Sequence, residues 1–206
     1  MAARLMRTRI VIFAKAPVPG QVKTRLIPAL GAEGAAELAQ RMLIDTWEQA
    51  SSVTVADSEI CASPDLSHPD WQGMLPAGAT VSAQGEGDLG ERLSNAAKRV
   101  IRDGQHVIFI GTDCPNLTER RLREACWELE SHDAVMHPTF DGGYALLGIK
   151  AFDPSIFSGI SWSTDSVARE TMGKIKALGW SLHLGKTLQD IDEPEDLLAA
   201  GLHRTS

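Results

Sequence analysis

The sequence predicts an α/β fold in which a mixed, mostly parallel sheet is covered by helices on both faces. Strand-like and helix-like segments alternate along the chain, which is typical of βαβ units. The segment QHVIFIG (105–111) is apolar at successive positions, as expected of a strand buried on both faces of a parallel sheet. The two apolar runs around the turn FDGG are joined too tightly for a parallel crossover, so one of them should run antiparallel.

The first half of the chain alternates strand and helix regularly. The β-branched run RIVIFA predicts a short buried strand at 9–14. Apolar residues then recur at helical spacing from Ala35 to Ala50, which predicts an amphipathic helix. Further strands are expected near 52–62 and at 80–84. A second helix carries the apolar residues between Leu89 and Ile101.

The second half continues this alternation after the strand QHVIFIG. Apolar residues from Leu122 to Leu129 predict a helix, and two strands, DAVMHPT and YALLGIK, flank the turn. A further helix should run from about Ser163 to Gly179, because glycine suits the position after a helix end. A last strand is expected at 180–184. Asp192 and Glu195 then have the spacing of a capping box that starts a short helix.

Composition excludes several classes of protein. A chain of 206 residues with 43% hydrophobic content and no internal repeat or linker predicts one domain over 1–206, with a core at about 9–200. The net charge of −7 and the pI near 5.3 argue against a nucleic-acid partner. No apolar run approaches the ~18 residues of a membrane span, and the run at 10–14 is too short for a secretory signal.

The three cysteines are widely spaced and odd in number, and the six histidines have no metal-ligand spacing in the sequence. This pattern fits a reducing compartment without structural zinc. We therefore expect a cytoplasmic protein that has no membrane partner. The sequence makes no prediction about its oligomeric state.

Positive charge is concentrated at the start of the chain. The first 32 residues carry a charge of +6 and the remainder carries −13. In the loop KAPVPGQVKTRL, Pro17 and Pro19 stiffen the backbone, and Gly20 allows the backbone to approach a ligand closely. The loop also supplies three cations, which are Lys15, Lys23 and Arg25. The loop lacks the spacing of a Walker A motif, but this composition suits an anion cradle. The alternative is a basic N-terminus without a binding role.

Four segments fall where an open α/β sheet binds its ligands, which is beyond the carboxyl ends of the strands. They are the basic loop, QGEGDLGER, GTDCPNL and DIDEPED. The second fits GxGxxG, but Glu86 and Asp88 would face a dinucleotide pyrophosphate with no cation in the glycine-rich loop itself. A ribose or base contact through Gln84, Gly87 and Gly90 is the favoured interpretation, and a dinucleotide site is the alternative.

Asp113 follows the most apolar strand directly and has two interpretations. It either caps the next turn or binds a metal ion, and the metal is favoured because Asn116 and Thr118 offer their own caps. A bound polyphosphate needs a hard divalent cation such as Mg²⁺, which prefers carboxylates and phosphate oxygens. Asp192 has the same two possible roles, metal ligand or helix cap.

Two further segments have both a structural and a functional interpretation. DGG at 141–143 is typical of an Asp-Gly hairpin turn, but it also suits an acceptor pocket that the missing side chains leave open. Trp162 is either a core residue or the aromatic wall of such a pocket. Cys114 has no Cys or His nearby in the sequence, so packing is its expected role.

Taken together, KAPVPGQVKTRL, QGEGDLGERL, GTDCPNL, DGGYALLGI, ISWSTDSV and DIDEPEDL resemble the motifs of a bacterial family. This is the DUF2064 group, also called the radical-SAM/selenodomain-associated transferase 1 family, within the glycosyltransferase-A superfold. The similarity runs from about Ile10 to Leu198. The chain also resembles, more distantly, the molybdenum-cofactor and phospholactate nucleotidyltransferases.

The resemblance implies a glycosyltransferase-A-like (nucleotide-diphospho-sugar transferase) three-layer sandwich with about seven strands. It implies a divalent metal, Mg²⁺ or Mn²⁺, on Asp113 and Asp192, and an acceptor pocket bordered by Asp141, Gly142, Gly143 and Trp162. With the residue analysis it predicts a nucleotide site made of ten residues. They are Ala14, Lys15, Pro17, Gly20, Lys23, Arg25, Gln84, Gly87, Gly90 and Thr112.

The favoured function is metal-dependent nucleotidyl transfer from an NTP to a small acceptor, with release of pyrophosphate. Lys23, Arg25 and Asp113 are the candidate catalytic residues, because three loop cations suit a triphosphate and its leaving group. The alternative is glycosyl transfer from an NDP-sugar, since the superfold supports both reactions. A third possibility is a nucleotide-binding protein without catalytic activity.

Overall fold

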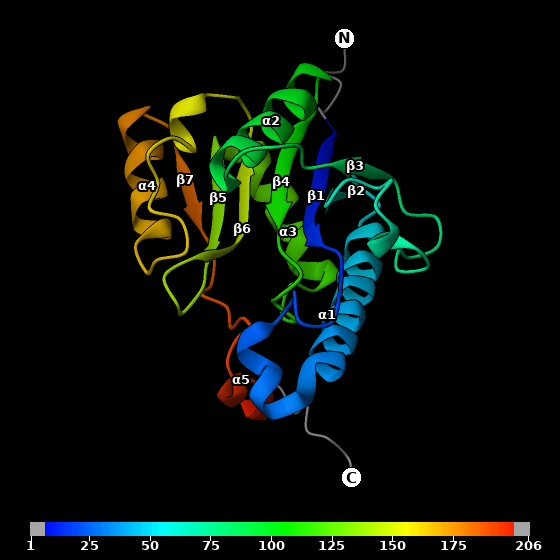
Figure 1. Ribbon diagram of the computed structural model, residues 1–206. Coiled ribbons are helices and arrows are strands. Elements are labelled where there is room, and N and C mark those ends of the chain that lie inside the picture. Colours follow the sequence, from blue (N-terminus) through cyan, green and yellow to red (C-terminus); the bar gives the residue numbers. More distant parts are fainter. Residues whose placement is uncertain (1–6, 200–206) are drawn as a thin grey trace.

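The computed structural model describes residues 7–199, and a seven-stranded sheet crosses its centre (Figure 1). The strands lie in the order β3-β2-β1-β4-β6-β5-β7. They are β1 (Thr8–Lys15), β2 (Ala56–Ser63), β3 (Val81–Ala83), β4 (His106–Ile110), β5 (Ala134–Pro138), β6 (Tyr144–Ile149) and β7 (Leu182–Leu184). Only β6 runs antiparallel to its neighbours β4 and β5, which confirms the reading of the tight connection around FDGG.

Helices cover both faces of this sheet (Figure 1). They are α1 (Ile27–Ser51), α2 (Leu89–Arg102), α3 (Glu119–Ser131) and α4 (Val167–Ala177). The short α5 (Pro194–Ala199) instead packs beside the first half of α1. Short 3₁₀ turns lie at Thr24–Leu26, Pro69–Trp71 and Pro154–Ile156. Apolar residues of α1 and α3 pack on one face, and those of α2 and α4 pack on the other. The predicted three-layer sandwich is therefore confirmed.

Successive side chains of a central strand point to opposite faces of the sheet, so each strand contributes to both hydrophobic cores. On β1, Ile10 and Ile12 belong to the core beneath α1 and α3, whereas Val11 belongs to the core beneath α2 and α4. All three side chains are fully buried. Burial of a side chain of this size stabilises a fold by roughly 1.5–3 kcal/mol, so both faces of β1 help to hold the sheet between its helix layers.

The strand order reverses between β1 and β4, which are parallel neighbours. From β1 the chain passes through α1 to β2 on one side, and from β4 it passes through α3 to β5 on the other. The loops that leave β1 and β4 therefore diverge, and a crevice forms between the carboxyl ends of the two strands. Open α/β sheets bind ligands in such a crevice.

Several helix boundaries differ from those expected. The first helix begins at Ile27 rather than near Ala35 and is kinked at Gly31, whose φ of 75° only glycine adopts easily. The helix expected from Ser163 begins at Val167, because Ser163 itself has a left-handed backbone with φ of 64°. The second strand likewise begins at Ala56, not 52.

The cap expected for the last helix was also wrong. Asp192 and Glu195 do not form a capping box there. Instead, a carboxylate oxygen of Asp196 accepts hydrogen bonds from the backbone N–H groups of Asp192 (3.0 Å) and Glu193 (2.7 Å). This leaves the Asp192 side chain free for another partner.

The ends of the predicted domain, 1–6 and 200–206, lie outside the described residues, so the domain boundary stays a prediction. Within 7–199, no helix is long and apolar enough to cross a bilayer.

Candidate active site

Two cavities adjoin at the carboxyl ends of β1 and β4. One of about 490 Å³ lies under the basic loop and is lined by Lys15, Lys23 and Gln84 among others; we call it the donor cavity, after the nucleotide site that the sequence predicts there. The other, of about 560 Å³, is lined by Asp141, Gly143 and Trp162 among others; we call it the acceptor cavity, after the acceptor pocket that the resemblance implies. The residues that line both cavities are Phe13, Arg25, Leu89, Asp113 and Asp192. The two cavities thus meet, and together they are lined by part of the predicted nucleotide and acceptor residues.

The basic loop leaves β1 and turns sharply before α1. Gly20 has a φ of 79° and Lys23 has a φ of 47°, so both residues adopt the left-handed conformation. This conformation is uncommon for a residue with a side chain and often marks a functional position. It directs Lys23 back toward the segment before α5. Lys15 stays exposed at the cavity and donates to the carbonyl oxygen of Gln21 at 3.2 Å.

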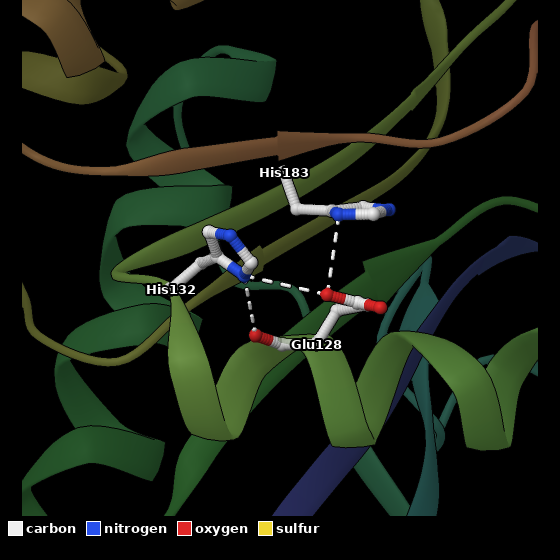
Figure 2. A group of neighbouring side chains, drawn as sticks. All are labelled: Glu128, His132 and His183. Carbon is white, nitrogen blue, oxygen red and sulfur yellow. Dashed lines mark hydrogen bonds and ion pairs between the residues drawn. The ribbon is translucent and has the colours of Figure 1, made fainter.

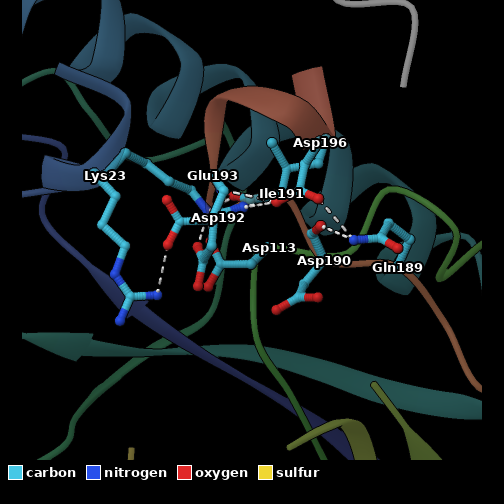
Figure 3. Close-up of polar contacts among 9 residues, drawn as sticks. Lys23, Asp113, Gln189, Asp190, Ile191, Asp192, Glu193 and Asp196 are labelled. Atoms are coloured by element: carbon cyan, nitrogen blue, oxygen red, sulfur yellow. Dashed lines mark hydrogen bonds and ion pairs between the residues drawn. The ribbon is translucent and has the colours of Figure 1, made fainter. Parts of the chain in front are cut away.

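Lys23 lies between two carboxylates that come from distant parts of the chain (Figure 3). Its ammonium pairs with Asp113, contacts Asp192 at 3.0 Å and donates to the carbonyl oxygen of Ile191 at 2.5 Å. The Lys23 side chain is only 6% exposed, whereas those of Asp113 and Asp192 are 48% and 42% exposed. Burial alone lowers the pKa of Lys23, but the two ion pairs outweigh it and hold the pKa above its usual value.

The Asp113 carboxylate pairs with Lys23 rather than with a backbone N–H of the next turn, so the cap interpretation of Asp113 is not supported. The side chain of Thr118 caps α3, while the carboxylate of Asp113 faces the site. The backbone carbonyl of Asp113 accepts from the N–H of Ile191 at 2.9 Å, which joins the loop after β4 to the segment that carries Asp192. Two carboxylates that already share one cation have the donor chemistry that Mg²⁺ requires. Asp113 and Asp192 therefore fit a hard divalent ion.

Arg25 differs from Lys23 in its surroundings. Its guanidinium lies 3.3 Å from the carboxylate of Glu193, and both side chains are more than half exposed. An exposed ion pair of this kind contributes little to stability. Arg25 can therefore exchange Glu193 for a ligand phosphate at low cost, and it lies at the junction of the two cavities.

Further acids surround the site, and the sequence did not single them out. Asp190 lies beside Asp192 and Asp196 (Figure 3). Burial, and then the charge of Asp141, raises the pKa of Asp190 to about 6. Asp190 and Asp192 form an Asp-x-Asp triplet. That spacing is the signal that could have identified Asp190.

The segment GEGDLG does not have the geometry of a dinucleotide site. It follows β3 at the edge of the sheet rather than β1 or β4, and Leu89 is the residue of the segment that lines the two cavities. Asp88 and Glu91 form a reciprocal capping box that starts α2, so these acids have a structural role. A side chain at Gly90 would lie 2.6 Å from the carbonyl oxygen of Phe157 and 2.7 Å from the Trp162 indole nitrogen, so Gly90 permits close packing.

Gln84 is buried at the donor cavity and bridges two strands. Its amide nitrogen donates to the carbonyl oxygens of Ala14 on β1 (3.2 Å) and Cys61 on β2 (3.0 Å). The amide oxygen lies 3.5 Å from Arg92. Gln84 therefore fixes the floor of the cavity, and its own hydrogen-bonding groups are largely used within the protein.

The DGG segment forms a turn, and of its three residues Asp141 and Gly143 line the acceptor cavity whereas Gly142 does not. Asp141 accepts hydrogen bonds from Thr139 and from the N–H of Gly143, as in an Asp-Gly turn. Gly142 packs against the start of α4, where a side chain would lie 2.1 Å from the carbonyl oxygen of Asp165. Trp162 packs on the core beneath α2 and α4 and also lines the cavity, while its contact with an acceptor stays a prediction.

The structure brings together most of the predicted site but not all of it. Six predicted nucleotide residues line the donor cavity: Ala14, Lys15, Lys23, Arg25, Gln84 and Thr112. Four others do not line it: Pro17, Gly20, Gly87 and Gly90. Cys114 is buried, and burial raises the pKa of its thiol, which agrees with a packing role.

Comparison with known proteins identifies the family and the fold of this chain. A family model described as an uncharacterized protein conserved in bacteria (DUF2064) matches residues 46–164. No curated protein matches the chain. A solved structure from Desulfovibrio desulfuricans G20, provisionally described as a nucleotide-diphospho-sugar transferase, is 30% identical, with a TM-score of 0.87 over 98% of this chain and 90% of its own.

Two more distant structures share the fold alone. The 4-diphosphocytidyl-2C-methyl-D-erythritol synthase of Anaerococcus prevotii DSM 20548 is 12% identical, with a TM-score of 0.61 over 96% of this chain and 95% of its own. The CMP:2-keto-3-deoxy-manno-octonic acid synthetase complexed with CTP is 11% identical, with a TM-score of 0.56 over 94% and 96%. From the family match and the 30% identical structure, this chain belongs to the DUF2064 family.

Proposed function

We propose that this protein is a metal-dependent transferase that uses a nucleotide-activated donor and a small acceptor. The observation that carries the proposal is the junction of the two cavities, where Arg25, Asp113 and Asp192 line both. A group bound in one cavity could reach a molecule bound in the other at this junction. The proposal is supported by the 30% identical structure described as a nucleotide-diphospho-sugar transferase.

Each residue of the junction has a distinct proposed role. Arg25 and Lys15 are exposed cations at the donor cavity and would bind phosphate oxygens. Mg²⁺ or Mn²⁺ held by Asp113 and Asp192 would supply charge that offsets the donor phosphates. Lys23 balances the two carboxylates in the absence of ligand and is near enough to the donor cavity to donate to a phosphate instead.

We favour nucleotidyl transfer, in which an acceptor oxygen attacks the α-phosphate of an NTP and pyrophosphate leaves. Its support is the number of cations around the donor cavity, because Lys15, Lys23 and Arg25 together suit a triphosphate. Glycosyl transfer from an NDP-sugar is the second candidate, supported by the description of the Desulfovibrio protein. Both reactions place the donor in the same cavity.

The lining of the acceptor cavity favours an uncharged acceptor. Its acidic residues are Asp113, Asp141, Asp165 and Asp192, and Arg25 is the cation among its lining residues. Its apolar wall includes Phe13, Phe109 and Trp162. Carboxylates repel a phosphorylated acceptor, whereas they accept hydrogen bonds from a hydroxyl group. We therefore propose a hydroxyl compound with an apolar body rather than a phosphate ester.

A ligand screen tests the proposal. Thermal unfolding would be followed with each NTP and NDP-sugar, with and without Mg²⁺, and NAD would serve as a control for nonspecific nucleotide effects. A ligand that binds the native state at 100 times its Kd should stabilise it by about 2.7 kcal/mol. Stabilisation by an NTP followed by pyrophosphate release supports nucleotidyl transfer, and hydrolysis of an NDP-sugar supports glycosyl transfer. Binding without turnover of any donor would mean a nucleotide-binding protein instead.

A further inference from the structure

A group of side chains with the chemistry of metal ligands lies at the end of α3 and on β7, apart from the residues that line the two cavities. Glu128 and His132 are one turn apart on and just after α3, and His183 lies on β7 (Figure 2). Their ligand atoms all lie within 4.8 Å of one another, and each side chain is part exposed. His132 and His183 are 51 residues apart. The histidines therefore show no metal-ligand spacing in the sequence, and only the fold brings them together.

The two distances from Glu128 to the histidines match those between ligands of a tetrahedral ion. One carboxylate oxygen of Glu128 lies 3.4 Å from Nδ1 of His132 and 3.2 Å from Nδ1 of His183. Ligands about 2.0–2.1 Å from a tetrahedral zinc ion are about 3.3 Å from each other. The two pairs with Glu128 already have this spacing, and the ligand atoms of all three residues lie within 4.8 Å of one another, so the side chains can close around one ion.

The ligand set selects the class of metal. Two imidazoles and one carboxylate suit Zn²⁺ and similar first-row ions, whereas Mg²⁺ prefers oxygen ligands alone. A small cavity of about 200 Å³ beside Glu128 and His183 leaves room for a water molecule as fourth ligand. Nδ1 of His132 also lies 3.0 Å from the Glu128 carbonyl oxygen. Metal binding would replace any proton that Nδ1 shares with that oxygen.

We propose that Glu128, His132 and His183 bind one Zn²⁺-class ion that joins the end of α3 to the edge strand β7. The strand has three residues and pairs with β5 on one side. The chain after β7 runs on to Ile191, which bonds to Asp113, and to Asp192. A metal cross-link at His183 would therefore secure the segment that brings Asp192 into the candidate active site. The role is structural, and the ion takes no part in the transfer.

Isothermal titration calorimetry with ZnCl₂ tests the proposal, using untagged full-length protein in excess Mg²⁺ to occupy any oxygen-ligand site. The wild type should bind one equivalent of Zn²⁺. His183→Gln should weaken this binding by at least about tenfold, because loss of a direct ligand exceeds the effect of losing an outer partner. The matched control is His68→Gln, which removes another exposed histidine that faces a carboxylate, Asp70, and should bind Zn²⁺ like the wild type.

A spectroscopic experiment distinguishes this site from the carboxylates of Asp113 and Asp192 in the candidate active site. Co²⁺ in place of Zn²⁺ should give the intense visible absorption of a tetrahedral ion with nitrogen ligands, and His132→Gln should abolish it. The proposal is overturned if wild-type protein binds no Zn²⁺, if His183→Gln binds it unchanged, or if only Asp113→Asn removes the binding. Because both experiments measure metal binding alone, their outcome is independent of whether the transferase proposal holds.

Discussion

In two clusters of this protein, one ionised side chain pairs with two side chains of opposite charge. The two clusters differ in their exposure to solvent and in the elements that carry them. Glu59 on β2 lies between Arg9 on β1 and Arg99 on α2, at 3.3 Å and 3.1 Å, and its side chain is 3% exposed. Lys23 lies between Asp113 and Asp192, whose side chains are nearly half exposed. The first cluster is built on regular elements, and the second is built on loops.

This difference indicates which cluster can exchange its ion-pair partners for a bound ligand or metal ion. Glu59 also accepts a hydrogen bond from Ser82 at 3.1 Å, so its oxygens are used within a closed network. Around Lys23, the carboxylates outnumber the cations and open on two cavities. A closed network holds elements together, whereas an open acidic one can accept a further cation. We expect substitutions in the two clusters to separate stability from activity.

The largest effect should come from Asp113→Asn. Loss of the anionic oxygen should lower turnover by at least about a hundredfold, in the range found when one electrostatic catalytic contact is removed. The melting temperature should stay within about 2 °C of wild type, because the Asp113 side chain is half exposed. Donor turnover with Mg²⁺ and thermal unfolding, measured on the same sample, check this. Unchanged activity would remove Asp113 from the site and leave Asp192 as the main metal candidate.

The opposite result is expected for Glu59→Gln. The change leaves two arginines without their buried counter-charge, and breaking a buried ion pair costs about 3–5 kcal/mol. Because Arg9 and Arg99 are partly exposed, the lower end of that range is expected. Chemical denaturation should show this loss while nucleotide affinity, measured on the folded protein, stays unchanged. A stable Glu59→Gln protein with weakened nucleotide binding would contradict the distinction between the clusters.

Lys23→Ala sharpens the comparison, because Lys23 has two proposed partners. Loss of a charged hydrogen bond to phosphate costs roughly 1.5–3 kcal/mol, so nucleotide should bind about ten- to a hundredfold more weakly. Mg²⁺ should bind more tightly in the absence of nucleotide, since the ammonium no longer competes for the two carboxylates. Calorimetry with each ligand separately measures both. If nucleotide bound as tightly as in wild type, the role of the loop would be misassigned.

Asp190→Asn should give the smallest change, and its sign depends on pH. The folded-state pKa of about 6 exceeds that of an unfolded aspartate, so the folded state binds the proton more tightly. Ionised Asp190 therefore lowers stability above about pH 6, and this penalty disappears as the pH falls toward 4. Asparagine should raise stability by about 1 kcal/mol at pH 7.5, after allowance for solvent screening, or about 2–4 °C in Tm.

Two controls belong to this last measurement. At pH 4 the Asp190→Asn protein and the wild type should melt together. At pH 7.5 saturating Mg²⁺ should reduce the difference, because a bound cation offsets the repulsion among the acids. A variant that is less stable than wild type at pH 7.5 would show that Asp190 has a favourable partner.

The sequence predicted which strands and loops form the site better than it predicted the contacts between their side chains. Strand ends follow from apolar runs, so the loops with Lys23 and Asp113 could be assigned to one edge of the sheet. The pairing of Lys23 with Asp192 could not, because it joins residues 169 positions apart and depends on the αL backbone of Lys23. Local cap rules also suggested Glu195 as partner of Asp192, whereas Asp196 takes that place.

The pairing of β1 with β4 has a consequence for how the protein folds. The register places Thr8 opposite His106, so the two strands that frame the crevice are separated by about half of the chain. Loop closure over such a distance is entropically costly, and sheets built on distant pairs form slowly. During synthesis, β1 and β2 can pair early, but the crevice cannot close until β4 has left the ribosome. Ligand binding by truncated nascent chains should therefore begin only after that point.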